Sequence, residues 1–172
     1  FMSDKQKNPV IIKYHWIKSD AKLLPILITY FIFLIFIFGE SFFLLKAQNT
    51  GYALSLLPLF VISSTLTQTL FSYVIGKKID NWGSKNILTI SFLFAFIATI
   101  SLYLNTLWIA FIFLGLLTVS SLNAIRSIIS KNAKNKATIY GIFYAGTATA
   151  SALGALIVGY IWNHFGESNA LE

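Results

Sequence analysis

Five polar side chains stand inside long apolar stretches of this sequence. They are the carboxylate of Glu40, the guanidinium of Arg126, the amides of Gln68 and Asn123, and the phenol of Tyr30. Ionisable and amide groups inside apolar spans are costly, and they commonly mark the path of a solute or an ion. A buried carboxyl can bind a cation or exchange a proton, and an arginine can clamp an anionic group. These five residues are therefore the candidates for a substrate or ion pathway.

Each candidate also has a simpler interpretation. Glu40 lies near the end of its stretch, where a carboxylate can be wetted from outside, and Arg126 can extend its side chain to the cytoplasmic interface. Asn123 can form a hydrogen bond between helices. Gln68 and Tyr30 can line a cavity wall, although tyrosines near span ends commonly anchor a chain in the aromatic belt. Lys46 is expected at the outer interface, with its stem along the lipid.

The composition excludes an ordinary water-soluble domain. Hydrophobic residues make up 56% of the 172 residues and charged residues 11%, whereas soluble domains carry about 25% charged residues. The net charge of +7 does not indicate nucleic acid, because the lysines fall between apolar runs and no nucleic-acid motif is present. The absence of cysteine excludes disulfides, and there is no phosphate-binding loop or nucleophile motif. We therefore expect no enzyme activity, no cofactor and no metal site.

Five apolar stretches are long enough to cross the roughly 30 Å hydrocarbon layer of a membrane as helices. A lipid-facing backbone must satisfy its own hydrogen bonds, which favours helix over open strand. The predicted fold class is therefore an all-α integral membrane protein, in which Pro58 can bend the second helix. The predicted helices cover residues 23–46, 53–75, 87–104, 107–128 and 138–162.

Basic residues alternate between the connections. Lysines gather in the N-terminal segment and in the second and fourth connections, whereas the other connections hold only Lys46. The positive-inside rule then places the N-terminus in the cytoplasm. Residues 1–22 are predicted to form a cytoplasmic linker or a helix on the membrane surface. Residues 23–166 form the transmembrane part, and residues 167–172 a tail that can be an expression remnant.

The polar connection GKKIDNWGSKN separates the second and third apolar stretches. Gly76 lets a neighbouring helix approach closely. Asp80, about one turn later, can face the positive end of another helix or pair with a basic side chain. Gly83 allows the chain to reverse, and Lys85 with its neighbouring lysines would bind lipid phosphates. The simpler interpretation is a solvated basic turn with no special role.

A second pattern, in the last apolar stretch, concerns packing. Small residues recur there at four-residue intervals: Gly146, Ala150 and Gly154. Such a stripe lets helices pack closely, so it predicts a helix–helix seam and not a binding site.

The polar connection resembles the loop signature of the major facilitator superfamily, G-x-x-x-D-R-x-G-R-R. Asn81 and Ser84 replace basic residues of that signature. The same glycine and Asx spacing returns at residues 159–166, which suits a repeat inverted in the membrane. Four positions match the signature: Gly76, Asp80, Gly83 and Lys85.

Two further stretches resemble the same superfamily. KATIYGIF, residues 136–143, is similar to the opening of its eleventh helix. Residues 39–48 with 57–59 resemble helix seven into helix eight of uncharacterised bacterial permeases. The resemblance therefore implies helices seven to eleven of a twelve-helix transporter, which is its C-terminal half without the twelfth helix.

That resemblance implies a secondary active transporter, a symporter or an antiporter, in a bacterial inner membrane. It would move a small solute by alternating access, and this fragment alone is expected to be inactive. The implied partners are lipid, the solute, and the missing N-terminal half and twelfth helix or a subunit that supplies them. The alternative is a non-transporting membrane assembly subunit or a decayed transporter remnant.

Overall fold

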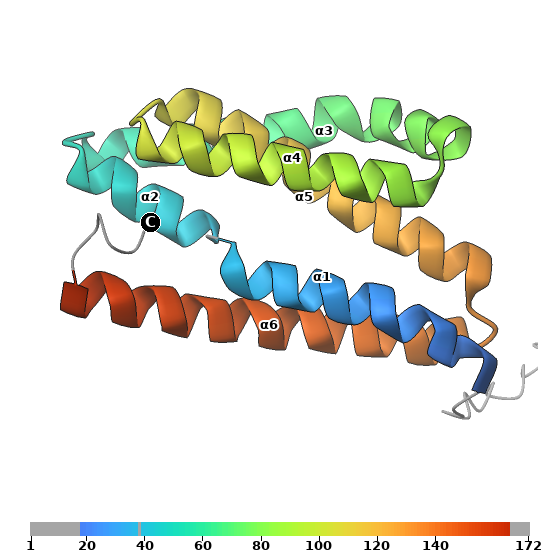
Figure 1. Ribbon diagram of the computed structural model, residues 1–172. Helices are drawn as coiled ribbons and strands as arrows, with labels where there is room; N and C mark the ends of the chain where they lie inside the picture. Colours follow the sequence, from blue (N-terminus) through green and yellow to red (C-terminus); the bar gives the residue numbers. More distant parts are fainter. Residues whose placement is uncertain (1–17, 38, 166–172) are drawn as a thin grey trace, which may run out of the picture.

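The computed structural model describes residues 18–37 and 39–165, and these residues form a bundle of roughly parallel and antiparallel helices (Figure 1). Five segments are long and apolar enough to cross a membrane, and the described residues contain no strand. The predicted all-α membrane fold with five spans is therefore confirmed. The elements are η1 (Lys18–Leu23), α1 (Leu24–Phe36), α2 (Glu40–Asn49), η2 (Leu54–Leu56), α3 (Leu57–Trp82), α4 (Ser84–Tyr103), α5 (Leu107–Asn132) and α6 (Lys136–Phe165).

The first predicted helix, 23–46, is broken in the structure. α1 ends at Phe36, Ile37 has extended backbone angles (φ −99°, ψ 140°), and α2 starts after Gly39 (φ −71°, ψ 158°). Glycine is a poor helix former because it loses the most backbone freedom on ordering. The break leaves the first turn of α2, with Glu40, at an interior level of the bundle and not at its end (Figure 1).

The second helix also differs from the prediction. Pro58 lies in the first turn of α3, where its missing N–H does no harm, and it does not bend the middle of the helix. At its other end α3 continues to Trp82, so Gly76 and Asp80 belong to the helix. The connection to α4 is consequently reduced to Gly83.

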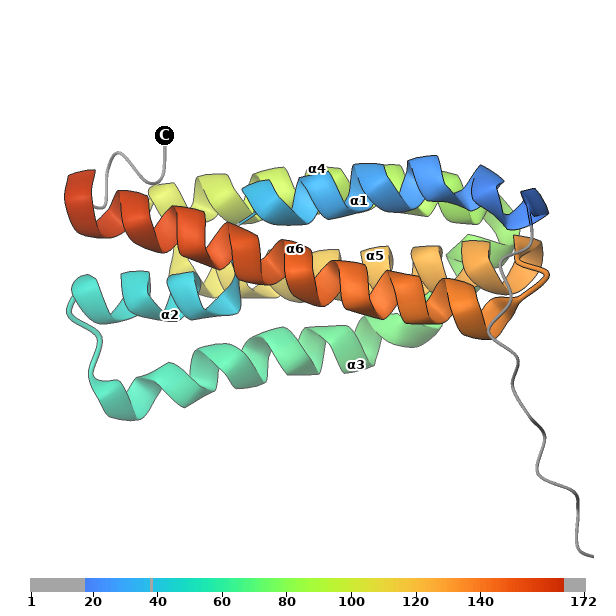
Figure 2. The same cartoon turned by 90° about the horizontal axis from the view of Figure 1, so that it is seen from below.

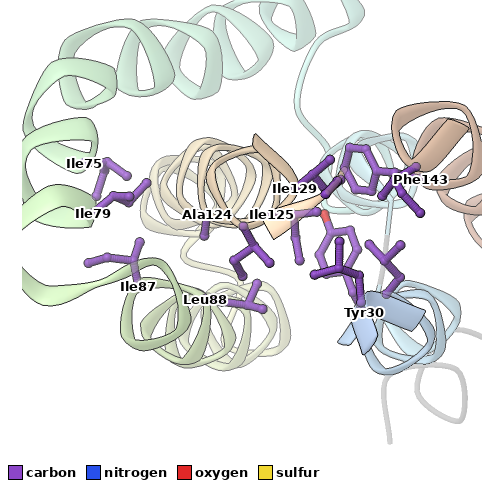
Figure 3. Close-up of a cluster of buried hydrophobic side chains, with 14 of the residues drawn as sticks. Tyr30, Ile75, Ile79, Ile87, Leu88, Ala124, Ile125, Ile129 and Phe143 are labelled. Carbon is purple, nitrogen blue, oxygen red and sulfur yellow. The ribbon is translucent and has the colours of Figure 1, made fainter. Parts of the chain in front are cut away.

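α5 is the centre of the bundle. It packs against α3 and α4, while α1 packs mainly against α6. Figure 3 shows this division in the buried cluster at one level: Ile125 and Ile129 of α5 lie between the α4 side chains and the pair Tyr30 and Phe143. The molecule is thus built from an α3–α4–α5 layer and an α1–α6 pair, and the two views in Figures 1 and 2 agree on this arrangement.

Two hydrophobic cores stabilise the bundle, one toward each end. The first is the cluster in Figure 3. The second contains an aromatic group, in which Phe60 stacks on Phe111 with ring centroids 5.1 Å apart and Phe43 meets Phe111 edge-on at 5.7 Å. α3 and α6 instead turn many large apolar side chains outward, which fits helices that lie in lipid.

The end of the bundle that holds the α3–α4 and α5–α6 turns also holds η1 (Figure 1). Residues 1–17 lie outside the described residues, and with them most of the predicted linker or surface helix. Its last residues are not a loose linker, because Asp20 is 2% exposed and its carboxylate accepts hydrogen bonds from the backbone N–H groups of Lys134 (3.0 Å) and Asn135 (2.9 Å). The hydrogen bonds of Asp20 thus connect the segment before α1 to the turn before α6.

The reversal at Gly83 depends on its backbone conformation. Its angles, φ 85° and ψ 148°, are allowed almost only for glycine. Gly83→Ala should therefore lower the free energy of unfolding by about 1–3 kcal/mol through backbone strain alone. Thermal or SDS-induced unfolding in detergent would measure this. Gly141→Ala, in a helix with open space around the glycine, is the control, and an equal effect of both changes would contradict the prediction.

Candidate functional site

A polar cavity of about 450 Å³ lies between the α1–α6 pair and the α3–α4–α5 layer, of which α3 and α5 line it. Its walls come from five helices, so it forms only when the bundle is assembled. Hydroxyl, amide and carboxylate groups share the walls with leucine and isoleucine. The polar side chains are those of Tyr30, Glu40, Ser64, Gln68, Thr118, Ser121, Thr147 and Ser151.

Hydrogen bonds fix part of this wall. The Tyr30 hydroxyl, on α1, donates to Ser121 Oγ, on α5, over 3.3 Å. The Gln68 amide donates to Ser64 Oγ, one turn earlier on α3, over 3.4 Å. These long bonds link neighbouring lining groups and leave acceptor capacity on each hydroxyl. The cavity can therefore offer both donors and acceptors to a bound solute.

Glu40 lines the cavity from the first turn of α2. The backbone N–H groups of this first turn point toward the start of the helix, on the same side as the carboxylate. Its side chain is exposed, and it makes no ion pair with any described residue. Glu40 is thus available to a cation or a proton that enters the cavity.

A second hollow, of about 540 Å³, adjoins the first toward the α5–α6 turn. Gln68 and Leu122 line both hollows, so the two are neighbours. Asn123 and Arg126 belong to the second one, together with hydroxyls of α3. The Arg126 guanidinium lies 5.9 Å from the ring of Tyr144 and, within the described chain, pairs with no carboxylate.

The structure therefore gathers all five candidate residues around two adjoining hollows. Tyr30 is 3% exposed, so it is a buried wall residue and not a belt anchor. Sequence reasoning missed several hydroxyls, and the available signal was weak: single serines and threonines within apolar helices. The missed lining residues are Ser64, Thr118, Thr147 and Ser151.

Lys46 differs from the expectation for it. Lys46 is only 8% exposed. It is therefore buried within the bundle, and its stem does not lie along lipid as expected. Ser120, which precedes the lining residue Ser121 on α5, is fully buried and lines neither hollow.

No residue of the polar stretch GKKIDNWGSKN, residues 76–86, lines either hollow. Asp80 pairs loosely with Lys131, Oδ1 to Nζ 3.5 Å, with both side chains more than half exposed. Gly76 has nothing within 4 Å of an added Cβ, so among the described residues no helix makes the close approach expected there. Lys85 is exposed, and Lys78 lies 3.8 Å over the ring of Trp82. Of the second glycine pattern, residue 166 lies outside the described residues.

The small-residue stripe of α6 meets α1. An added Cβ at Gly154 would lie 2.7 Å from the Ile35 carbonyl oxygen, and one at Gly146 would enter the ring of Phe31. Ala150 is 4% exposed. The two glycines of the stripe thus lie against the α1 segment, and none of the three small residues lines the cavity.

The fold and the cavity together define a class: a helical membrane protein with a polar cavity between its helices. A family model described as the Major Facilitator Superfamily matches residues 4–167. The chain therefore belongs to this superfamily, a family of membrane transporters. No curated protein and no solved structure matches the chain. Within the described residues, no group of three or more His, Cys, Asp or Glu side chains could hold a metal ion.

Proposed function

We propose that this chain supplies one wall of the solute path in a secondary active transporter that works by alternating access. The observation that carries the proposal is the pair of adjoining hollows, around which five polar side chains from four helices meet inside an apolar bundle. Polar cavities enclosed by membrane helices are where transporters of this kind hold their solutes. The chain would correspond to helices seven to eleven, within the C-terminal half.

The rest of the proposal concerns placement in the cell. The exposed lysines gather at the end of the bundle with the α3–α4 and α5–α6 turns, which supports a cytoplasmic side there. The bacterial inner membrane is proposed from the resemblance to bacterial permeases alone. An N-terminal half and a twelfth helix, or a subunit that supplies them, would complete the path. Glu40 would be the proton-coupling candidate, since it is the carboxylate that lines the cavity.

Water access to the cavity tests this function without knowledge of the solute. The chain has no cysteine, so single cysteines can be placed freely. Thr118→Cys faces the first hollow, whereas Leu66→Cys lies on the outward face of α3 and is 54% exposed in the bundle. In membranes, we expect a polar maleimide to modify the cavity cysteine at least about tenfold faster, because a thiol in lipid cannot ionise.

The same assay separates transport from a purely structural role. Labelling of Thr118→Cys from each side of the membrane in turn should show two accessible states when the complete transporter is assembled. Equal, slow labelling of both cysteines would refute the polar path. Access from one side only, whatever the conditions, would favour a non-transporting assembly subunit.

A further inference from the structure

The second hollow has one cationic group and no anionic one. Its volume, about 540 Å³, lies within the range of small-molecule sites. Among the described residues that line it, Arg126 is the only charged one, and no carboxylate is present. The hollow therefore offers a positive charge to a solute without an acid to compensate it. The other polar groups are amides and hydroxyls, those of Thr65, Gln68, Thr69, Ser72 and Asn123.

Two contacts fix how α3 and α5 lie beside each other along this hollow. Gly115 of α5 meets the backbone carbonyl oxygen of Ser64, and Lys131 Nζ lies 3.5 Å from Asp80 Oδ1. In both pairs the two residues are 51 positions apart. The helices therefore run in the same direction, and each α5 residue is about level with the α3 residue 51 positions before it.

This register places three hydrogen-bond donor groups of the hollow together. Asn123 is level with Ser72, and Arg126 follows Asn123 by three positions on the same face of α5. Within the described residues, the Asn123 amide and the Ser72 hydroxyl form no hydrogen bond. The Arg126 guanidinium has the ring of Tyr144 5.9 Å away and no acceptor among the same residues. All three groups are thus able to donate into the hollow.

These donors match the chemistry of an oxyanion. A guanidinium within a membrane span is costly unless it is paired or wetted. Its planar fork of N–H groups fits two oxygens of a carboxylate or a phosphate, and the amide of Asn123 and the hydroxyl of Ser72 can donate to the same oxygens. Extension of Arg126 to the membrane interface would satisfy its charge, but it would leave Asn123 and Ser72 without partners.

The remaining hydroxyls of α3 suit a different part of a solute. Thr65 and Thr69 donate their hydroxyl hydrogens to the carbonyl oxygens of Val61 (2.9 Å) and Thr65 (3.0 Å), one turn earlier. Each hydroxyl has a single hydrogen, so only its lone pairs are left for a solute. Lone pairs disfavour an anionic group and accept from O–H or N–H groups. These acceptors lie about one and two turns before Ser72 on α3.

We propose that the second hollow binds the oxyanion group, a carboxylate or a phosphate, of a small hydroxylated solute, with that group at Arg126, Asn123 and Ser72. This solute class rests on the transport function proposed above and requires only the second hollow. It predicts that negative charge on the solute determines binding and that Arg126 recognises this charge.

The test is protection of Thr69→Cys from a neutral polar maleimide, in membranes that contain the complete transporter. Thr69 lines the second hollow, three positions before Ser72. Four probes share a hydroxylated six-carbon body and differ in charge: gluconate, glucose 6-phosphate, neutral sorbitol and cationic glucosamine. We expect the two anions to slow labelling at concentrations about tenfold lower than sorbitol or glucosamine requires, because hydrogen bonds between charged groups are stronger than neutral ones.

Variants in the Thr69→Cys background assign the charge to Arg126. Arg126→Gln should abolish the preference for the anions. Arg126→Lys should restore part of it, because the charge returns without the planar fork. Lys131→Gln removes a cation from the same helix, at the exposed pair with Asp80, and it should leave the preference unchanged. The comparison of the four probes on Thr69→Cys itself stands even where a variant fails to fold.

Several outcomes would overturn this solute class. They are an unreactive Thr69→Cys, equal protection by all four probes, no protection by any, and a preference for anions that survives Arg126→Gln. A lipid phosphate at Arg126 would also overturn it. In that case Arg126→Gln would speed labelling without any probe in membranes, but not in a maltoside detergent free of phospholipid.

The proposed function is tested separately, at the first hollow, by the reactivity of Thr118→Cys. A reactive Thr118→Cys with no anion preference at Thr69→Cys would leave the transport function standing and refute only the solute class. An unreactive Thr118→Cys would refute the function itself, so the two failures are distinguishable.

Discussion

Asp20→Ala should lower the free energy of unfolding by about 2–4 kcal/mol, since the change removes a charged acceptor shared by two backbone N–H groups. Asp20 is 2% exposed, and its oxygens lie 3.0 Å and 2.9 Å from the amide nitrogens of Lys134 and Asn135. Without this carboxylate, both amides would lose a charged acceptor at a partly buried site. The start of α1 would then separate from the turn before α6.

The measurement is SDS-induced unfolding in detergent, followed by helical circular dichroism. Asp20→Asn keeps the shape and one acceptor oxygen, so it should have an intermediate effect. Asp80→Asn is the matched control for loss of one carboxylate near the same end of the bundle, and it should cost under about 1 kcal/mol because its pair with Lys131 is exposed. If Asp20→Ala lowered the free energy of unfolding no more than Asp80→Asn does, the hydrogen bonds of Asp20 would not stabilise the fold.

Asp20 also shows what sequence reasoning cannot reach. It lies in a polar segment that the charge pattern assigns to a linker or surface helix, and its partners are backbone amides 114 and 115 positions away. Every residue except proline has a backbone N–H group. No sequence motif can therefore identify the two amides that bond to Asp20. Only the packing of α1 against α6 brings the two segments together.

The helices themselves were largely predictable, because span length and hydropathy are properties of the sequence. Four of the five predicted spans correspond to single helices of the structure, although α3 begins later and ends further on than expected. The break at Ile37–Gly39 was not foreseen, since one glycine in an apolar run is compatible with a continuous helix. The break matters for the site because it places Glu40 at a helix start that faces the cavity.

Among the side chains that line the two hollows, the charged groups, the amides and the Tyr30 phenol stand out in the sequence, whereas most serine and threonine hydroxyls do not. Glu40, Gln68 and Arg126 stand out because such groups are costly in an apolar span, whatever their orientation. Thr118 and Ser151 do not stand out, since serine and threonine in membrane helices usually bond to their own backbone. Thr118 does make such a bond, to the Leu114 carbonyl oxygen at 2.9 Å, and it still lines the cavity.

Gly115→Ala should destabilise the bundle by about 2–3 kcal/mol, at the upper end of the effect of overpacking. An added Cβ would lie 2.5 Å from the Ser64 carbonyl oxygen and 3.0 Å from Thr67 Cβ, so α3 and α5 would have to separate. The obstacle is backbone, which cannot move aside as a flexible side chain can. Because Ser64 and Gln68 of α3 and Thr118 of α5 line the first hollow, this separation should also widen the cavity.

Two measurements separate this account from a general effect of alanine in a helix. Gly76→Ala lies in α3 with nothing within 4 Å of the new Cβ, so it should be neutral or raise stability by up to about 1 kcal/mol through better helix propensity. The labelling rate of Thr118→Cys should rise in the Gly115→Ala background and stay unchanged in the Gly76→Ala background. Should Gly115→Ala melt like the wild type and leave the labelling rate unaltered, the close contact between α3 and α5 would not be what sets the width of the cavity.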